Sequence, residues 1–390
     1  MKITDIKTTP LLVPYSRPYY WAQGVIEGAC VILVEVHTDS GIVGYGESIG
    51  SPSAEAIEAY LKRAARLCIG RDPFSNARLM ADAYQGLLQA FGTCSSPRFS
   101  GQVLCGLELA LWDVVGKATG RPAYDLLGGA VRSEVCYFGF AQGENAAEVA
   151  ADAGHLAREG FDVIYFKAGR GDALDLETAA AVRTAIGSKK RLRVDPNEQW
   201  TPVHAARMIR ELLAFDVEVV EQPTPCESIA ALAQVRANSP ISISADQSVF
   251  TPFEAYEVCR QQAADLIVVG LHETGGLTRL SKVAHIAEAA GINICIHGLY
   301  ETGITTCASN QIAATIPNLD DANQHMTRFL AWDIVKTPDL KPRGGRLPIL
   351  KGPGLGFEID WDGVERAQRC FAEREATFIS EVPQLRLTPV

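Results

Sequence analysis

The chain contains 390 residues, of which 47% are hydrophobic and 21% charged, and its net charge is −10. This balance is typical of a globular enzyme, and without a block of lysine and arginine it argues against nucleic acid or an anionic membrane surface as a partner. Because the ten cysteines are scattered and neither a signal peptide nor a long apolar run is visible, we expect a cytoplasmic protein with reduced thiols.

Strands followed by helices are predicted for the first part of the chain. The runs 31–37 and 42–48 flank the turn TDSG, which predicts a β-hairpin. The segment 15–24 (YSRPYYWAQG) is aromatic and interrupted by proline and glycine, so we expect a loop there. Three helical patterns follow, and the last is apolar on most sides and therefore expected to be buried. They span residues 54–68, 77–88 and 102–120.

From about residue 134 short strands alternate with helices, and seven such units of roughly 25 residues predict a parallel barrel. In 292–297 (INICIH) isoleucine alternates with Asn, Cys and His, as expected for a strand between outer helices and a partly polar barrel axis. A tail rich in glycine and proline begins near residue 340, and a charged helical pattern spans 364–375. The predicted strands are 135–141, 161–169, 191–197, 217–223, 241–247, 265–273 and 292–298, with helices at 146–159, 201–215 and 277–291 among those between them.

Three carboxylates end strand-like runs at nearly equal spacing. Asp195 ends RLRVD, Glu221 ends VEVVE 26 residues later, and Asp246 ends ISISAD after a further 25 residues. Because the carboxyl ends of barrel strands lie at one end of the barrel, we expect these side chains to converge. Converging carboxylates repel one another without a counter-charge, and all-oxygen ligation suits Mg²⁺. The alternative is that each acid faces an arginine or a helix N-terminus of its own.

Lys167 and His297 also lie at inward-facing strand ends. A lysine beside a divalent cation has a lowered pKa, so Lys167 is a candidate base, and the alternative is a structural ion pair with one of the carboxylates. His297 and His272 are candidate acids, and Glu301 is a further candidate site residue. For these three the alternative is a buried side chain with a purely structural role.

Several motifs together resemble those of the mandelate racemase/muconate lactonizing enzyme group of the enolase superfamily. RVDPNEQW, VEQP and SADQS are similar to the three metal-ligand motifs of that group. GLELALWDVVGKATGRPAYDLLGG (106–129) is similar to the segment that leads into the family's barrel. ETGGLTRLSKVAHIAEAAGI and GPGLGFEI are similar to later segments, so the resemblance spans nearly the whole chain.

The resemblance implies an α/β fold, namely a modified (β/α)7β barrel of TIM type with an α+β capping domain. The barrel would span residues 131–345, and the capping domain would be formed by 1–130 and completed by 346–390. Mg²⁺ would be held by Asp195, Glu221 and Asp246. The segments 15–24 and 49–55 would cover the barrel mouth and select the substrate. Candidate substrate-binding residues are Tyr165, Asn197, Glu301, Tyr20 and Trp21.

The chemistry that the resemblance implies is removal of a proton α to a carboxylate, through an ene-diolate that the metal ion stabilises, as is general in the enolase superfamily. Two departures bear on it. Tyr165 stands where the family usually has the first lysine of a Lys-x-Lys pair, so Lys167 is the remaining base. Gly270 stands where members have an opposing Lys, or an Asp that orients the seventh-strand His, so we expect His297 to lack an orienting carboxylate.

One base and one unsupported histidine favour a metal-dependent lyase: β-elimination, either dehydration of a hydroxy or sugar acid or eliminative opening of a lactone or ether ring. The alternative is a racemase, epimerase or cycloisomerase. Remote alternatives are a Schiff-base aldolase that uses Lys167 and a non-catalytic metal-binding protein. The aromatic residues Tyr15, Tyr19, Tyr20 and Trp21 would favour a less polar substrate. We further expect a small-molecule carboxylate as the substrate and a homo-oligomer as the assembly.

Overall fold

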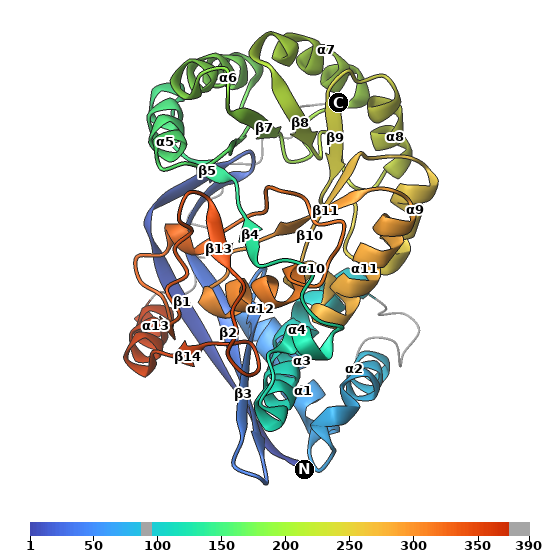
Figure 1. Ribbon diagram of the computed structural model, residues 1–390, viewed down its shortest axis with the longest axis vertical. Helices are drawn as coiled ribbons and strands as arrows, with labels where there is room; N and C mark the ends of the chain where they lie inside the picture. Colours follow the sequence, from blue (N-terminus) through green and yellow to red (C-terminus); the bar gives the residue numbers. More distant parts are fainter. Residues whose placement is uncertain (87–95, 374–390) are drawn as a thin grey trace.

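The computed structural model describes residues 1–86 and 96–373, which form an antiparallel sheet with its helices and a parallel barrel (Figure 1). The last two residues of the helical patterns predicted at 77–88 and 364–375 lie outside the described residues. None of the helices in these two ranges is long and apolar enough to cross a membrane. The domain boundaries near residues 130 and 345 stay predictions.

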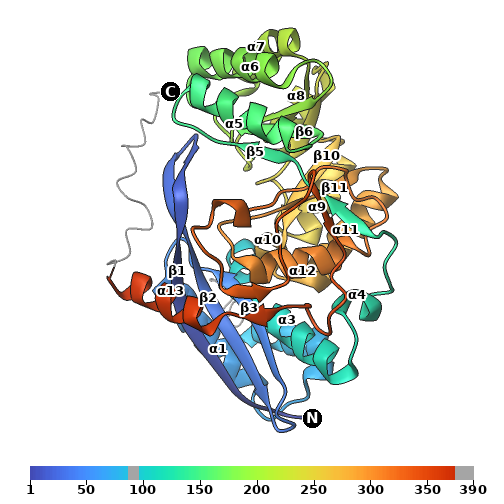
Figure 2. The same cartoon turned by 60° about the vertical axis from the view of Figure 1, so that its left-hand side comes forward.

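The antiparallel sheet contains β1 (Ile3–Trp21), β2 (Gly24–Thr38) and β3 (Val43–Ile49) in that order. The hairpin predicted around TDSG is therefore confirmed. The loop predicted at 15–24 is wrong, because β1 and β2 continue as paired strands, with Tyr19 opposite Ile26 and Trp21 opposite Gly24. Aromatic residues favour strands, and in this part of the hairpin the pairing is irregular between Pro14 and Tyr19. The tip of this hairpin, residues 15–26, reaches the barrel beside β5 (Figure 2).

Helices cover the antiparallel sheet, and α3 packs directly on β3. Its close approach depends on glycine, because a Cβ built on Gly46 would lie 2.2 Å from the carbonyl oxygen of Gly106. As expected, α3 is buried along most of its length. The helices of this part are α1 (Ala54–Cys68), α2 (Asn76–Tyr84), α3 (Pro97–Thr119) and α4 (Ala123–Leu126), and α13 (Trp361–Glu373) packs on β1 from the other end of the chain.

Seven parallel strands form the barrel in chain order, which confirms the predicted strand–helix repeat. The strands are β5 (Gly139–Ala141), β6 (Val163–Lys167), β7 (Arg191–Asp195), β8 (Val217–Glu221), β9 (Ser242–Ala245), β10 (Leu266–Gly270) and β11 (Asn293–His297). The outer helices are α5 (Ala146–Arg158), α6 (Asp172–Ile186), α7 (Pro202–Leu212), α8 (Ile229–Ala237), α9 (Pro252–Arg260), α11 (Leu277–Ala289) and α12 (Gly303–Ala313). Among residues 1–86 and 96–373, the remaining strands form two short pairs, β4 (Glu134–Cys136) with β13 (Arg346–Pro348) and β12 (Val335–Thr337) with β14 (Glu358–Ile359).

The barrel is closed by the irregular segment 318–324. On one side the Gln324 amide donates to the Ile296 carbonyl oxygen at 2.9 Å. On the other side the Asn323 amide donates to the Cys136 carbonyl at 2.9 Å, and the Asn323 carbonyl accepts from the Phe138 amide at 3.0 Å. This segment therefore occupies the place of an eighth strand, and the fold is the modified (β/α)7β barrel with a capping domain that the sequence predicted.

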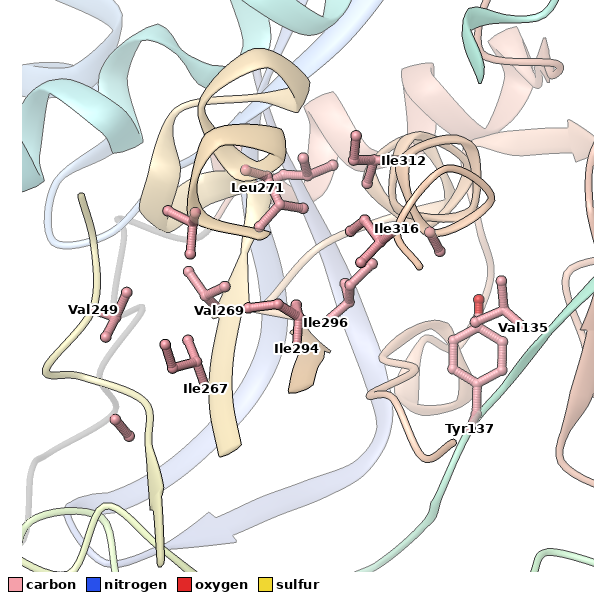
Figure 3. Packing of buried hydrophobic residues seen from close by; sticks show 14 of the residues in the cluster. Val135, Tyr137, Val249, Ile267, Val269, Leu271, Ile294, Ile296, Ile312 and Ile316 are labelled. Atoms are coloured by element: carbon pink, nitrogen blue, oxygen red, sulfur yellow. The ribbon is translucent and has the colours of Figure 1, made fainter. Parts of the chain in front are cut away.

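The alternation within the strands has the predicted effect. Ile294 and Ile296 of β11 point toward the helices, near Ile312 of α12 (Figure 3). Cys295, between them, belongs to the separate cluster inside the barrel. The predicted strands are longer than the observed ones, and the run 135–141 is divided between β4 and β5. The largest difference is at β10, which ends at Gly270, because the next residues form the short helix α10 (Leu271–Thr274). His272 therefore lies on a helix and not on an inward-facing strand position.

Two glycine-to-alanine substitutions should change stability in opposite directions. Gly46→Ala should destabilise the protein by about 3 kcal/mol, because its new methyl group meets the backbone of α3. Gly154→Ala in α5 should stabilise it by roughly 0.5 kcal/mol, because the nearest atom is the mobile end of Arg158 at 3.3 Å and alanine favours the helix. Urea unfolding midpoints measure both. Equal stability of Gly46→Ala and wild type would contradict the close packing of α3 on β3.

Candidate active site

Neighbouring strand ends bring three carboxylates together. Asp195 ends β7, Glu221 ends β8, and Asp246 directly follows β9. One carboxylate oxygen from each lies within 4.8 Å of one from each of the others, and all three side chains are buried. The convergence that the spacing predicted is therefore present in the structure.

Gln222 ties two of these strand ends to each other. Its side-chain oxygen accepts from the backbone amides of Asp246 at 2.9 Å and Ser248 at 3.1 Å. Its side-chain nitrogen donates to the Thr224 carbonyl at 2.8 Å and to the Ser248 hydroxyl at 2.9 Å. Gln222 was not among the predicted site residues, although its place directly after Glu221 in VEQP was an available signal.

The three acids lack sufficient counter-charge. Burial, and then the charges of Asp195 and Asp246, raise the pKa of Glu221 well above its usual range. Burial also raises the pKa of Asp246, to about 8, despite the opposing attraction of His297. Neither oxygen of Asp246 has a hydrogen-bond partner in the described part of the chain. Buried oxygens left without donors and under mutual repulsion are the donor set that a hard divalent cation requires.

Lys167 and Tyr165 of β6 contact one end of this cluster. The Lys167 ammonium lies 2.5 Å from Asp195 Oδ2. The Tyr165 hydroxyl lies 2.7 Å from the same oxygen and 2.9 Å from Glu221 Oε1. Burial alone would lower the pKa of Lys167, but the attraction of Asp195 and Glu221 outweighs it and raises that pKa. Asn197, the third residue predicted at this end, donates its backbone amide to Asp195 Oδ1 at 2.7 Å.

His297 ends β11 and contacts the other end of the cluster. Its Nδ1 lies 2.7 Å from Glu273 Oε1 and 3.6 Å from Asp246 Oδ1. The second oxygen of Glu273 accepts the backbone amide of Gly270. The expectation that His297 lacks an orienting carboxylate is therefore wrong. The acid was expected at the strand end, whereas α10 turns the chain so that a glutamate three residues later reaches the histidine.

The charges around His297 determine its protonation. Burial lowers the pKa of the imidazole, but the attraction of Asp246 and Glu273 outweighs burial and raises that pKa to about 10. Lys167 and His297 therefore lie beside opposite members of the acid trio, one at Asp195 and the other at Asp246. A small molecule bound at the trio would have one proton-carrying group near each end.

His272, the second candidate acid, and Glu301, a predicted substrate-binding residue, have different surroundings. His272 hydrogen-bonds Thr305 of α12 through Nε2 at 3.1 Å, and burial, together with the charge of His297, lowers its pKa to about 3. Glu301 accepts the Leu299 amide at 3.1 Å, and burial, together with Glu47, raises its pKa to about 8. His272 is therefore a neutral side chain bonded to a helix of the barrel and not to the carboxylate cluster.

The hairpin tip covers the barrel mouth with aromatic rings. Burial, and then the charges of the three carboxylates, raise the pKa of Tyr19 well above its usual range. The Tyr19 ring packs edge-on against Phe140 (5.5 Å) and Tyr300 (6.1 Å), and Trp21 packs on Tyr300 at 6.4 Å. Tyr20 lies on the other face, beneath the Arg170 guanidinium at 5.3 Å. The charges that act on Tyr20 are instead those of Glu144 and Glu148, and the substrate-binding role of Tyr20 and Trp21 stays a prediction.

Comparisons with known proteins cover nearly the whole chain. The family described as "Enolase C-terminal domain-like" matches residues 147–363, and the "Mandelate racemase / muconate lactonizing enzyme, N-terminal domain" matches residues 3–128. Muconate cycloisomerase 1 of Rhodococcus opacus is 31% identical over 381 residues, which cover 94% of this chain and 98% of the relative. L-Ala-D/L-Glu epimerase of Bacillus subtilis (strain 168) is 29% identical over 365 residues, which cover 92% and 97%.

A solved structure adds information about ligands. The dipeptide epimerase from Enterococcus faecalis V583, complexed with Mg and the dipeptide L-Leu-L-Tyr, matches with a TM-score of 0.84 at 26% identity. The match covers 92% of this chain and 100% of that chain. A structural relative thus holds magnesium and a small carboxylate, and the buried acid trio of this chain is consistent with a metal site.

The pKa of Asp246, raised first by burial and then by neighbouring carboxylates, predicts a specific pH dependence. The folded chain holds a proton on Asp246 up to about pH 8, whereas the unfolded chain releases it near pH 4, so this residue costs stability as the pH rises through that window. Without divalent cations, the Tm of Asp246→Asn relative to wild type should therefore increase from about pH 4 to about pH 8. Asp216→Asn, which changes an exposed carboxylate, should show no such trend.

Magnesium should remove the Tm advantage of Asp246→Asn over wild type near pH 8. Wild type should gain Tm on addition of Mg²⁺ because the cation binds the folded state and relieves the repulsion, whereas Asp246→Asn should gain little. Thermal denaturation in EDTA and in millimolar Mg²⁺ measures the effect. A pH-independent difference between the variant and wild type, or an equal Mg²⁺ response, would exclude the trio as a cation site.

Proposed function

Since this chain belongs to the mandelate racemase/muconate lactonizing enzyme group of the enolase superfamily, we propose that it is an isomerase that moves a proton on the carbon α to a carboxylate. The chain is an enzyme of that group, and its named relatives are cycloisomerases and epimerases. These relatives support the isomerase alternative better than the β-elimination that the sequence favoured. The substrate is a small carboxylate, as the dipeptide ligand of the structural relative suggests.

The observation that carries this proposal is the contact between His297 and Glu273. A carboxylate that accepts from Nδ1 fixes the imidazole ring and leaves Nε2 as the nitrogen that exchanges a proton. Elimination was favoured on the expectation of an unsupported histidine. With Glu273 in contact, two competent groups, Lys167 and His297, flank the acid trio, and this is what proton transfer on two faces requires.

Asp195, Glu221 and Asp246 would hold Mg²⁺. When bound, the ion would neutralise the trio, lower the pKa of the flanking lysine and histidine, and stabilise the negative charge that develops on the substrate carboxylate. Tyr165 orients Asp195 and Glu221 through its hydroxyl group. Tyr19 and its aromatic neighbours exclude water from the mouth.

Two side chains of the protein carry out the proton transfers. Lys167 removes the α-proton on one face, and His297 delivers a proton to the same carbon from the other face. The reverse direction exchanges their roles, so each enantiomer is deprotonated by a different residue. Glu273 stabilises the imidazolium form that His297 passes through. Homo-oligomer formation stays a prediction.

Cycloisomerisation is a second candidate, because muconate cycloisomerase 1 shares 31% identity over almost its whole length. The two candidates differ in the number of working proton-transfer groups. A racemase or epimerase needs Lys167 and His297 alike, whereas a cycloisomerase that uses Lys167 alone should tolerate His297→Asn.

Solvent-deuterium exchange tests the assignment of the bases. Wild type with Mg²⁺ in D₂O should exchange the α-proton of both enantiomers of a substrate found by screening dipeptides, N-acyl amino acids and sugar acids by NMR. Lys167→Ala should lower the exchange rate of one enantiomer, and His297→Asn should lower that of the other, each by roughly 10²–10⁴-fold. Glu273→Gln should weaken only the exchange that depends on His297.

His272→Asn is the matched control, because it changes a buried histidine that contacts Thr305 instead of the acid trio. It should leave the ratio of the two exchange rates unchanged. If wild type released a β-substituent from its substrate and did not exchange the α-proton on both faces, the proposed isomerisation would be wrong and elimination would take its place. Exchange from both enantiomers that survives His297→Asn would remove the histidine from the mechanism.

A further inference from the structure

Two segments that resemble family motifs and come from different parts of the chain meet in space. GLELALW (106–112) belongs to α3 of the capping domain, and ETGGLT (273–278) contains the end of α10 and the start of α11. A Cβ built on Gly101 of α3 would lie 2.4 Å from the carbonyl oxygen of Glu273. The backbones of α3 and α10 are therefore in direct contact at the residue that orients His297.

Glu108 supplies the N-terminal cap of α11. Its carboxylate accepts from the backbone amides of Leu277 (2.9 Å) and Thr278 (3.1 Å) and from the Thr278 hydroxyl (2.6 Å). The residue at the cap position of α11 itself, Gly276, has no side chain to do this. A Cβ on Gly276 would lie 2.2 Å from Glu108 Oε2, and its φ of +116° already favours glycine. The helix is thus capped from the capping domain.

These contacts fix both ends of the segment that carries Glu273. On one side, β10 ends at Gly270, whose amide binds the Glu273 carboxylate. On the other side, Gly275 and Gly276 connect α10 to α11 while packed against Gly101 and the Glu108 carboxylate. The short helix α10 has little freedom to move unless α3 moves as well. The Trp112 indole nitrogen also donates to Glu108, at 2.8 Å, and keeps its carboxylate in place.

We propose that Gly101 and Glu108 of the capping domain are positioning residues for the Glu273–His297 pair. The capping domain then contributes to the chemistry on the His297 face through α3, separately from the hairpin that covers the mouth. The catalytic part of this proposal rests on the proposed isomerase function, whereas the structural part does not. Loss of either residue should displace Glu273 and weaken proton transfer at His297 while leaving Lys167 and the acid trio intact.

Two variants test the proposal. Glu108→Gln keeps the size of the side chain but turns an amide group toward backbone donors, and Gly101→Ala places a methyl group against Glu273. Each should lower His297-dependent exchange by about 10- to 100-fold, since small displacements of a catalytic group have effects of this size. Lys167-dependent exchange should remain within about threefold of wild type, and the Mg²⁺ affinity measured by calorimetry should be unchanged.

Asn145→Ala is the matched control, because it removes the side-chain cap of α5, whose oxygen accepts the Glu148 amide at 3.0 Å. Asn145→Ala should lose a similar amount of stability, but its site does not contact α10. The ratio of the two exchange rates should therefore stay as in wild type. If Glu108→Gln and Gly101→Ala lower both rates equally, or leave His297-dependent exchange unchanged, the proposal is overturned.

A second measurement does not depend on activity. The proton between His297 Nδ1 and Glu273 should give a low-field NMR resonance, assigned by its loss in His297→Asn. This resonance should disappear or shift in Glu108→Gln and Gly101→Ala and persist in Asn145→Ala. Absence of exchange in wild type would reject the isomerase function alone, and the resonance would then decide the positioning role. An unchanged resonance in both variants would reject that role.

Discussion

Electrostatic repulsion among Asp195, Glu221 and Asp246 is the constraint on which the rest of the site depends. Three buried carboxylates on adjacent strand ends cannot all be ionised without compensating charge. Burial is the largest cause of the raised pKa values of Glu221 and Asp246, and the charges of neighbouring carboxylates raise them further. The chain places one cationic group at each end of the trio and leaves the oxygens of Asp246 without donors among the described residues. A divalent cation would supply the remaining charge.

In the proposed reaction, the same arrangement would let the two flanking groups act on one substrate. Lys167 comes from β6 and His297 from β11, and the strands with the acids lie between them in the sheet. The barrel therefore sets the distance between the two groups. The segments that connect strands and helices determine which side chains contact them. Glu273 contacts the imidazole, α3 of the capping domain packs on the segment that carries Glu273, and Tyr19 of the hairpin tip packs on Phe140. The capping domain thus contacts the site in two separate places.

The sequence was sufficient to predict the structure wherever a regular repeat determines it. Period-two alternation and the spacing of the acids predicted the seven strands and the convergence of Asp195, Glu221 and Asp246, because parallel strands of a barrel must end on one side. It was insufficient where a tertiary contact overrides the local pattern. The proline-interrupted tip of β1 pairs as a strand, segment 318–324 closes the barrel without strand-like alternation, and Glu273 reaches His297 only because α10 begins at the strand end.

Anomalous diffraction from crystals soaked with Mn²⁺ tests the central claim most directly, because it locates a cation without reference to activity. We predict one strong peak within bonding distance of Asp195, Glu221 and Asp246, with Lys167 and His297 on either side of it. A peak at another acidic group, such as Glu198 with Cys226 and Glu227, and none at the trio would contradict the claim. So would side chains of the trio that point away from one another in the soaked crystal.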